Sequence, residues 1–171
     1  DKPKNTQALQ RRYQSRFTNA RLGREAVSRR EYIIAIKNYN EYLKILADIN
    51  GQEPLTLKPE VLDAEKELSE LLLVSHIYWE LTKIYDMTPK LQDEFSKVLN
   101  QFVVFTVNQP FQVVNAELLR KHMKRPTTSN YDELKAAYDK IFVESDGCFI
   151  SSLCFSQNHF ITNDLRLLKA K

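Results

Sequence analysis

The chain has 171 residues and a net charge of +3, with 43% hydrophobic and 27% charged residues. A chain of this length buries roughly 70% of the surface that its unfolded form exposes, so it can hold one domain together without a disulfide or a metal. Three glycines, nine Phe and eight Tyr favour bulky-cored helices with few tight turns, and we therefore expect a single all-α domain.

The charge is unevenly distributed along the chain. Residues 1–30 hold nine Lys or Arg against two acids, whereas the remaining residues hold 16 against 20. Two cysteines are too few for the disulfide framework of a secreted domain, and no apolar run approaches the ~20 residues that span a bilayer. We therefore expect a cytoplasmic protein without a membrane span, in which a basic first helix precedes a mildly acidic body.

The first two expected helices cover residues 7–28 and 32–49. Leu22, Gly23 and Ala26 mark one face of the first helix. The second helix has apolar residues at i, i+3, i+4 and i+7 spacing, namely Tyr32, Ala35, Ile36, Tyr39 and Leu43. Alternating small and large side chains let two antiparallel helices approach closely, so we expect a tight hairpin that ends at Asn50-Gly51.

This pattern, over residues 16–49, resembles one tetratricopeptide repeat. The resemblance implies a hairpin whose first helix lines a groove that receives a peptide of a partner protein. The residues that it places in the groove are Phe17, Ala20, Arg24, Val27 and Ser28. Arg24 stands where a polar residue often contacts a peptide carboxylate. Tyr42 stands where Ala is usual, so we expect its ring to displace the next helix or to cover a gap.

Four further helices are expected, and a short last one from about residue 162 would make seven. Helix 59–87 is acidic at its start and apolar on nearly every side in its second half, which predicts the buried centre of the domain. Helix 90–107 would complete a second, degenerate pair of the same type. Helix 112–124 ends in a basic cluster, and Asn130 with Glu133 predicts a capping box for helix 131–143.

The carboxy-terminal residues have a different character. Cys148-Phe149-Ile150-Ser151-Ser152, followed by Leu165-Arg166, resembles the bacterial carboxy-terminal segment called the CFI box. The resemblance covers residues 148–171 and implies a bacterial origin but no particular chemistry. We expect residues 146–171 to form a compact cap on a helical domain of residues 1–145.

Few side chains suggest catalysis or metal binding. Cys148, Cys154 and His159 could form a thiol or metal site, but their spacing matches no common zinc pattern, which favours buried structural cysteines. His76 lies in the most apolar helix and is expected in the core, whereas His122 lies in a basic run and is expected in solvent. We therefore predict no enzyme activity, no cofactor and no metal.

Three hypotheses remain for the arginine-rich first helix. Phe17, Arg21, Arg24 and Ser28 could bind another protein or a peptide, including an acidic one, which would make the chain an adaptor or scaffold. The arginines could instead pair with the acidic residues of the body, such as those between Glu60 and Glu70. Helix 7–28 together with residues 120–125 could also follow a nucleic-acid backbone.

Overall fold

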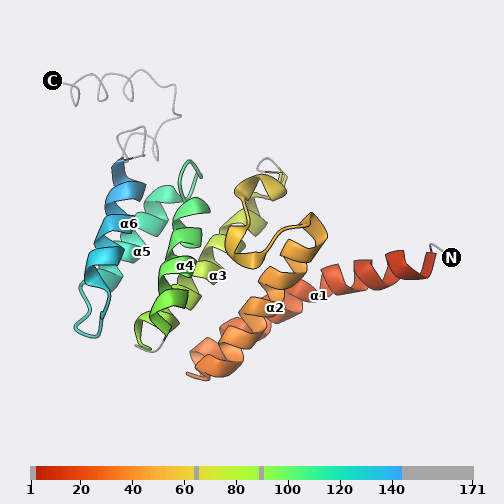
Figure 1. The fold of residues 1–171 in the computed structure, drawn as a ribbon, viewed down its shortest axis with the longest axis horizontal. Coiled ribbons are helices and arrows are strands. Elements are labelled where there is room, and N and C mark those ends of the chain that lie inside the picture. Colours follow the sequence, from red (N-terminus) through yellow and green to blue (C-terminus); the bar gives the residue numbers. More distant parts are fainter. Residues whose placement is uncertain (1–2, 64–65, 89–90, 144–171) are drawn as a thin grey trace, which may run out of the picture.

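In the computed structural model, the chain forms three antiparallel helical hairpins that follow one another in sequence order (Figure 1). The structure describes residues 3–63, 66–88 and 91–143, which contain six α-helices, two short 3-10 helices and no strand. The hairpins pair α1 (Pro3–Ser28) with α2 (Tyr32–Asn50), α3 (Leu68–Asp86) with α4 (Gln92–Val104), and α5 (Gln112–Met123) with α6 (Tyr131–Val143). The all-α prediction is confirmed. The expected cap of residues 146–171 lies outside the described residues.

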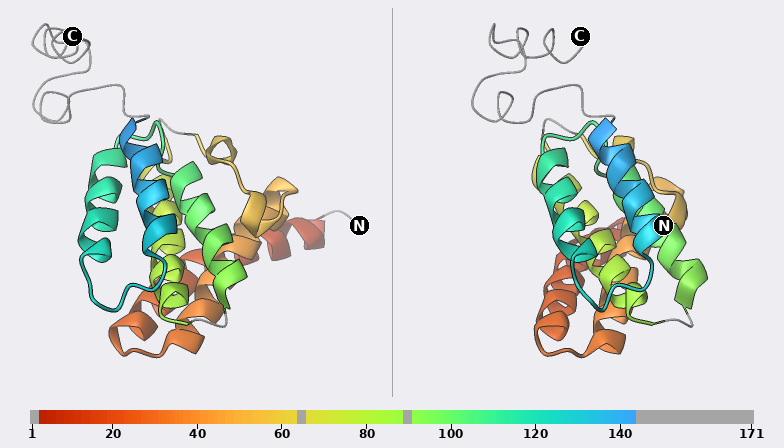
Figure 2. Two further views of the ribbon diagram at one scale, coloured as in Figure 1. Left: turned by 60° about the vertical axis from the view of Figure 1, so that its left-hand side comes forward. Right: turned by 90° about the vertical axis from the view of Figure 1, so that its left-hand side faces the viewer.

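The six helices form two layers. Helices α1, α3 and α5 lie in one layer, and α2, α4 and α6 lie in the other (Figure 2). Thirteen of the 19 residues of α3 are buried, which confirms that this helix is the centre of the domain. Among the described helices, none combines the length and the apolar character that crossing a membrane requires.

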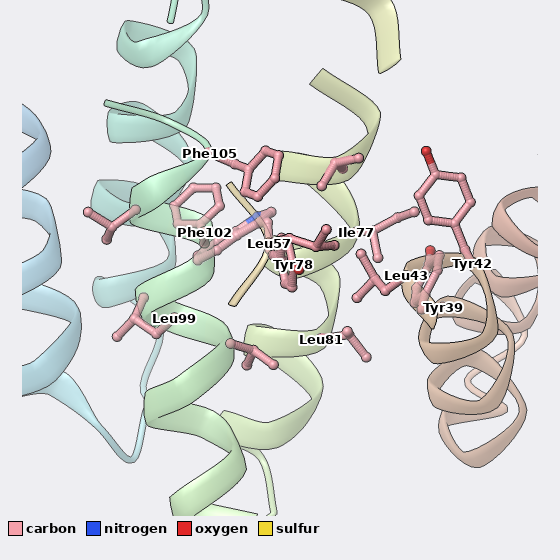
Figure 3. Packing of buried hydrophobic residues seen from close by; sticks show 14 of the residues in the cluster. Tyr39, Tyr42, Leu43, Leu57, Ile77, Tyr78, Leu81, Leu99, Phe102 and Phe105 are labelled. Atoms are coloured by element: carbon pink, nitrogen blue, oxygen red, sulfur yellow. The ribbon is translucent and has the colours of Figure 1, made fainter. Parts of the chain in front are cut away.

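The hydrophobic core is continuous from α2 through α3 to α4 (Figure 3). Aromatic rings supply much of its volume: the ring centroids of Tyr78 and Phe105 lie 5.6 Å apart, and those of Trp79 and Phe102 lie 5.1 Å apart. Burying such rings is the main favourable contribution to folding, and tilted pairs of this kind add to it. The prediction that Phe and Tyr fill the core is confirmed.

Helix α3 begins at Leu68 and not at residue 59, because the preceding segment has no apolar face of helical period. Leu57 and Leu62 are its buried anchors, and Pro59–Val61 forms only a short 3-10 helix, η2. The neighbouring 3-10 helix, η1 (Pro54–Thr56), is tied down by Gln101 of α4, whose side-chain nitrogen donates to the Leu55 carbonyl over 2.7 Å. The linker is therefore packed on the core as irregular structure.

A buried ion pair joins the first hairpin to α3. The Arg16 guanidinium donates from Nε to Glu70 Oε1 over 2.6 Å and from Nη2 to Glu70 Oε2 over 2.8 Å. Tyr42 of α2 donates to the same carboxylate over 2.8 Å, and Arg16 Nη1 donates to the Tyr13 carbonyl. The guanidinium carbon lies 3.3 Å from the ring centroid of Tyr13 and 4.0 Å from that of Phe17. Both charges thus leave water but keep several polar or aromatic partners.

The side chain of Tyr42 lies between α2 and α3 and contacts this ion pair. Its side chain is fully buried, so the ring fills the space between α2 and α3, and its hydroxyl supplies a third hydrogen bond to Glu70. Burial and the negative charge of Glu70 raise the pKa of Tyr42, which keeps the hydroxyl protonated and able to donate. Of the two outcomes expected from sequence, the ring therefore covers the gap.

A second polar cluster joins α3 to the third hairpin. Asp86 Oδ2 lies 2.8 Å from His122 Nε2, and Asp86 Oδ1 accepts hydrogen bonds from the backbone N–H groups of Ser129 and Asn130 and from the Asn130 side chain. The prediction that His122 is solvated is wrong: His122 is 5% exposed, because it continues the buried stripe of α5 three residues after Leu119.

The expected capping box of Asn130 and Glu133 does not form. The Asn130 backbone N–H donates to Asp86, and the Glu133 carboxylate accepts from Gln92 and Ser96 of α4. The same residue pair thus contributes tertiary contacts, which a local sequence pattern does not reveal.

The Arg16–Glu70 ion pair generates a stability prediction. Replacing Glu70 by Leu leaves the Arg16 charge buried without its carboxylate, so we expect the free energy of unfolding to fall by about 3–5 kcal/mol. Replacing Arg16 by Met and Tyr42 by Phe in the same chain removes the orphaned groups and should restore most of that loss. Urea unfolding measures both effects.

The exposed pair Arg21–Glu25, with 2.7 Å between Nη1 and Oε1, provides the control for this experiment. Arg21→Ala should cost no more than about 0.5 kcal/mol, because water solvates both charges. A loss of similar size for Glu70→Leu would show that the buried pair does not hold α1 on α3.

Candidate binding groove

Two adjoining depressions lie along the seam between α1 and α3. The first, which we call the Arg24 pocket, has a volume of about 230 Å³ and is lined by Phe17, Ala20, Arg21, Arg24, Tyr39, Leu73, His76 and Ile77. The second, the Glu67 pocket, has a volume of about 330 Å³ and is lined by Phe17, Lys66, Glu67, Ser69, Glu70 and Leu73. Because Phe17 and Leu73 line both pockets, the two form one groove with an apolar ridge between them.

The ridge residue Phe17 is held in place by the buried ion pair. Its ring stacks on the Arg16 guanidinium, yet the residue is 47% exposed. A large aromatic side chain that is fixed on one side and open to solvent on the other is a common anchor at protein interfaces. The ion pair therefore joins α1 to α3 beside the groove and contacts the ring that forms its ridge.

Gly23 lets the ring of Tyr39, which comes from α2 and lines the Arg24 pocket, lie against the backbone of α1. A Cβ atom at Gly23 would lie 2.5 Å from Cε1 and 2.6 Å from Cδ1 of the Tyr39 ring, closer than any real contact. Only glycine allows the ring to lie against the helix backbone at this position. The small residue Gly23 opposite the large residue Tyr39 thus allows the aromatic ring to form part of the pocket lining.

The Tyr39 hydroxyl is buried but has no hydrogen-bond partner among the described residues. Tyr39 is 1% exposed. Burial raises the pKa of Tyr39, the nearby charge of Glu80 raises it further, and the charge of Arg24 opposes this. The group is therefore a neutral phenol next to two charged side chains. An unpaired buried hydroxyl costs roughly 1–3 kcal/mol, so its persistence calls for an explanation.

The charges around the Arg24 pocket are largely paired, with one exception. Arg21 is bound to Glu25, and the nearly buried Glu80 is bound to Lys83, each over 2.7 Å. Arg24 makes no ion pair or side-chain hydrogen bond within the part of the chain that the structure describes. The pocket thus has one cation, Arg24, that no acidic residue of the described ranges neutralises.

His76 forms part of the pocket wall, and its predicted place in the core is wrong. Its side chain is 44% exposed, and Nε2 lies 3.4 Å from Glu80 Oε1. Burial lowers the pKa of His76, and the charges of Lys83 and Arg24 lower it further, whereas Glu80 raises it. The imidazole is therefore neutral at pH 7, with its ring open to the pocket.

The structure brings most of the expected groove residues together. Phe17, Ala20 and Arg24 line the Arg24 pocket, as does Arg21. Val27 instead packs partly buried on the core, and Ser28 is exposed at the end of α1, where its hydroxyl donates to the Glu25 carbonyl. The sequence did not suggest Tyr39, His76 or Leu73 as groove residues, because they come from helices other than α1.

The hypothesis that the arginines pair with the acidic body is confirmed for two of them. Arg12 donates to Asp48 of α2 over 2.7 Å, and Arg16 is bound to Glu70 of α3. In the second basic cluster, Arg120 is bound to Glu117 within α5 over 2.6 Å. Three of the five arginines of α1, namely Arg12, Arg16 and Arg21, are therefore paired within the fold, whereas Arg11 and Arg24 make no ion pair in the described part of the chain.

The buried cluster of Asp86 and His122 offers no open site. Asp86 and His122 are both buried, and they are enclosed by their hydrogen bonds and by the Trp79 ring, 5.3 Å from the imidazole. The described ranges contain no group of three or more His, Cys, Asp or Glu side chains that could hold a metal ion. Cys148, Cys154 and His159 lie outside those ranges.

Comparisons with known proteins give no match: no protein-family model matches the chain, and searches of the curated proteins and of the solved structures find none either. The resemblances to a tetratricopeptide repeat and to the CFI box therefore stay predictions.

The buried histidine generates a prediction about pH. Burial lowers the pKa of His122 below its ordinary 6.5, although Asp86 opposes this. Its Nδ1 atom has no partner among the described residues, so a proton added there would be unsatisfied. The unfolded chain takes up this proton near pH 6.5, whereas the folded chain does so only at lower pH.

The stability that depends on neutral His122 is thus fully present above about pH 6.5 and is lost as the pH falls through the folded pKa. We expect the free energy of unfolding to decrease from about pH 7.5 to pH 5, with the neutral His76 acting in the same direction. Urea unfolding at several pH values, together with NMR titration of the histidine rings, measures this. A folded pKa of His122 at or above 6.5 would contradict the prediction.

Proposed function

We propose that this chain is a protein-interaction module, an adaptor or scaffold of the cytoplasm, that binds an acidic segment of a partner reversibly through the groove between α1 and α3. The observation that carries the proposal is Arg24, an unpaired cation in a pocket that adjoins the exposed ring of Phe17. Interfaces commonly combine such an aromatic anchor with a charge that selects the partner.

The partner's acidic character follows from the charges at the groove. Because Arg21 and Lys83 are already bound to carboxylates, Arg24 is the cation whose pairing is left to a ligand. An acidic residue on a partner would pair with Arg24 through a charge-assisted hydrogen bond, which strengthens as the bound partner excludes water from the pocket. An apolar residue of the same segment would lie on the ridge formed by Phe17 and Leu73.

Nucleic-acid binding is less favoured by the charges on α1. A phosphate backbone is bound by several cations whose counterions are released on binding. On α1, however, Arg12, Arg16 and Arg21 are bound to acidic residues of the chain. Breaking these ion pairs would offset much of the binding free energy that contacts with phosphate groups provide.

The role of Arg24 can be tested by charge reversal. We expect Arg24→Glu to reduce the partner captured from a nuclease-treated native lysate by at least about tenfold, because it replaces an attractive charge by a repulsive one. Urea unfolding should be little changed, since Arg24 is exposed. Quantitative mass spectrometry of the captured proteins measures the effect.

The matched control is Arg29→Glu, which makes the same charge change at an exposed residue just after α1 that does not line the groove. It should leave capture unchanged. Equal losses for Arg24→Glu and Arg29→Glu would indicate general attraction to net charge, and loss of every captured species on nuclease treatment would favour the nucleic-acid hypothesis.

A further inference from the structure

We propose that the Arg24 pocket is a subsite for a single carboxylate, which accepts a hydrogen bond from the Tyr39 hydroxyl and pairs with Arg24, while His76 forms another part of the wall. This inference rests on the proposed function and names the chemical group that the groove recognises. It starts from Tyr39, a residue of the pocket lining whose hydroxyl is buried and unpartnered in the described structure.

A ligand acceptor would resolve the unsatisfied hydroxyl. The phenol is neutral, so it offers an O–H donor, and the charge of Arg24 acts on the same oxygen. A carboxylate has two oxygens, so it can accept from the hydroxyl with one and from the guanidinium with the other. The Tyr39 ring cannot turn away easily, because it is packed against Gly23.

The charge of the pocket favours a monoanion over a phosphate dianion. Arg21 is neutralised by Glu25, and Lys83 is neutralised by Glu80, which leaves the single positive charge of Arg24. The positive charge of Arg24 balances one negative charge on a ligand, and a second one would be left unbalanced beside the buried Glu80, whose charge acts on both Tyr39 and His76. A single carboxylate carries the one negative charge that Arg24 can neutralise.

The apolar wall of the pocket favours a ligand that has an apolar group next to its carboxylate. Phe17 and Leu73 form the apolar ridge at one side of the pocket. The volume of about 230 Å³ is of the size of one amino-acid residue and is below the range of pockets for drug-sized molecules. We infer that the group bound is the carboxylate of a peptide, either its carboxy terminus or an acidic side chain, with an apolar neighbour on the ridge.

The pKa of the His76 imidazole is expected to change when an anion binds in the pocket. The charged groups that act on it are Glu80 and Lys83 of α3 and Arg24 of α1, and Tyr39 of α2 and Arg21 of α1 line the same pocket. A bound anion adds a negative charge beside the ring and therefore favours its protonated form. Binding should then raise the pKa of His76 and strengthen as the pH falls towards 6.

The test is an NMR titration of the full chain with matched small probes, read on the His76 ring. N-acetylphenylalanine carries a carboxylate, its amide carries none, and the amide of N-acetylaspartate carries only a side-chain carboxylate. Inorganic phosphate, titrated at about pH 8, is the dianion. We expect N-acetylphenylalanine to bind at least about tenfold more tightly than its amide and to raise the His76 pKa. The aspartate probe distinguishes a side-chain carboxylate from a carboxy terminus.

Tyr39→Phe removes the hydroxyl and keeps the ring against Gly23. It should weaken N-acetylphenylalanine binding by about tenfold, the loss expected for one hydrogen bond to a charged group, without lowering the stability of the protein. Tyr32→Phe, on the same helix, is the control and should change neither. Equal binding of acid and amide, unchanged binding by Tyr39→Phe, or tighter binding of phosphate would overturn the subsite.

These outcomes are separable from those for the proposed function. If Arg24→Glu abolishes partner capture while Tyr39→Phe does not weaken the acid probe, the groove binds a partner but the carboxylate subsite is wrong. If the acid probe binds as expected while partner capture survives Arg24→Glu, the subsite stands and the proposed function fails.

Discussion

The buried ion pair between Arg16 and Glu70 is the interaction on which the first half of the structure depends. It is the main polar link between α1 and α3, and Tyr42 brings α2 into the same cluster. Two charges removed from water are tolerated only because each has several partners. The stacked ring of Phe17 extends this cluster to the surface, so the contact that fixes α1 on α3 also shapes the groove between them.

One basic helix thus serves two purposes along its length. Arg12 and Arg16 attach α1 to α2 and α3, whereas Arg24, two turns beyond Arg16, is left unpaired next to a pocket. Gly23, the neighbour of Arg24, admits the Tyr39 ring whose hydroxyl is unsatisfied. Phe at position 39 would give a more stable protein, because it has no hydroxyl to leave without a hydrogen bond. We therefore propose that the Tyr39 hydroxyl binds a ligand.

The helices and the central position of α3 could be predicted from sequence, because apolar period and end signals are local. The groove could be predicted only in part. Phe17 and Arg24 lie on one helix, but the Arg16–Glu70 pair spans 54 residues of sequence and the His122–Asp86 pair spans 36. Those partners decide that Arg16 and His122 are buried. His76 was misassigned because an apolar helix need not be covered on every side, and the groove leaves its ring open.

The central claim is that a partner binds in the groove between α1 and α3, and site-specific photo-cross-linking tests it most directly. The photoreactive residue p-benzoylphenylalanine would replace Phe17 at the ridge and, in a control protein, Ile33 of α2, which is 84% exposed and lines neither pocket of the groove. We predict a cross-link from position 17 to an acidic segment of one protein and none from position 33. Cross-links from position 33 to the same protein, with none from position 17, would contradict the claim.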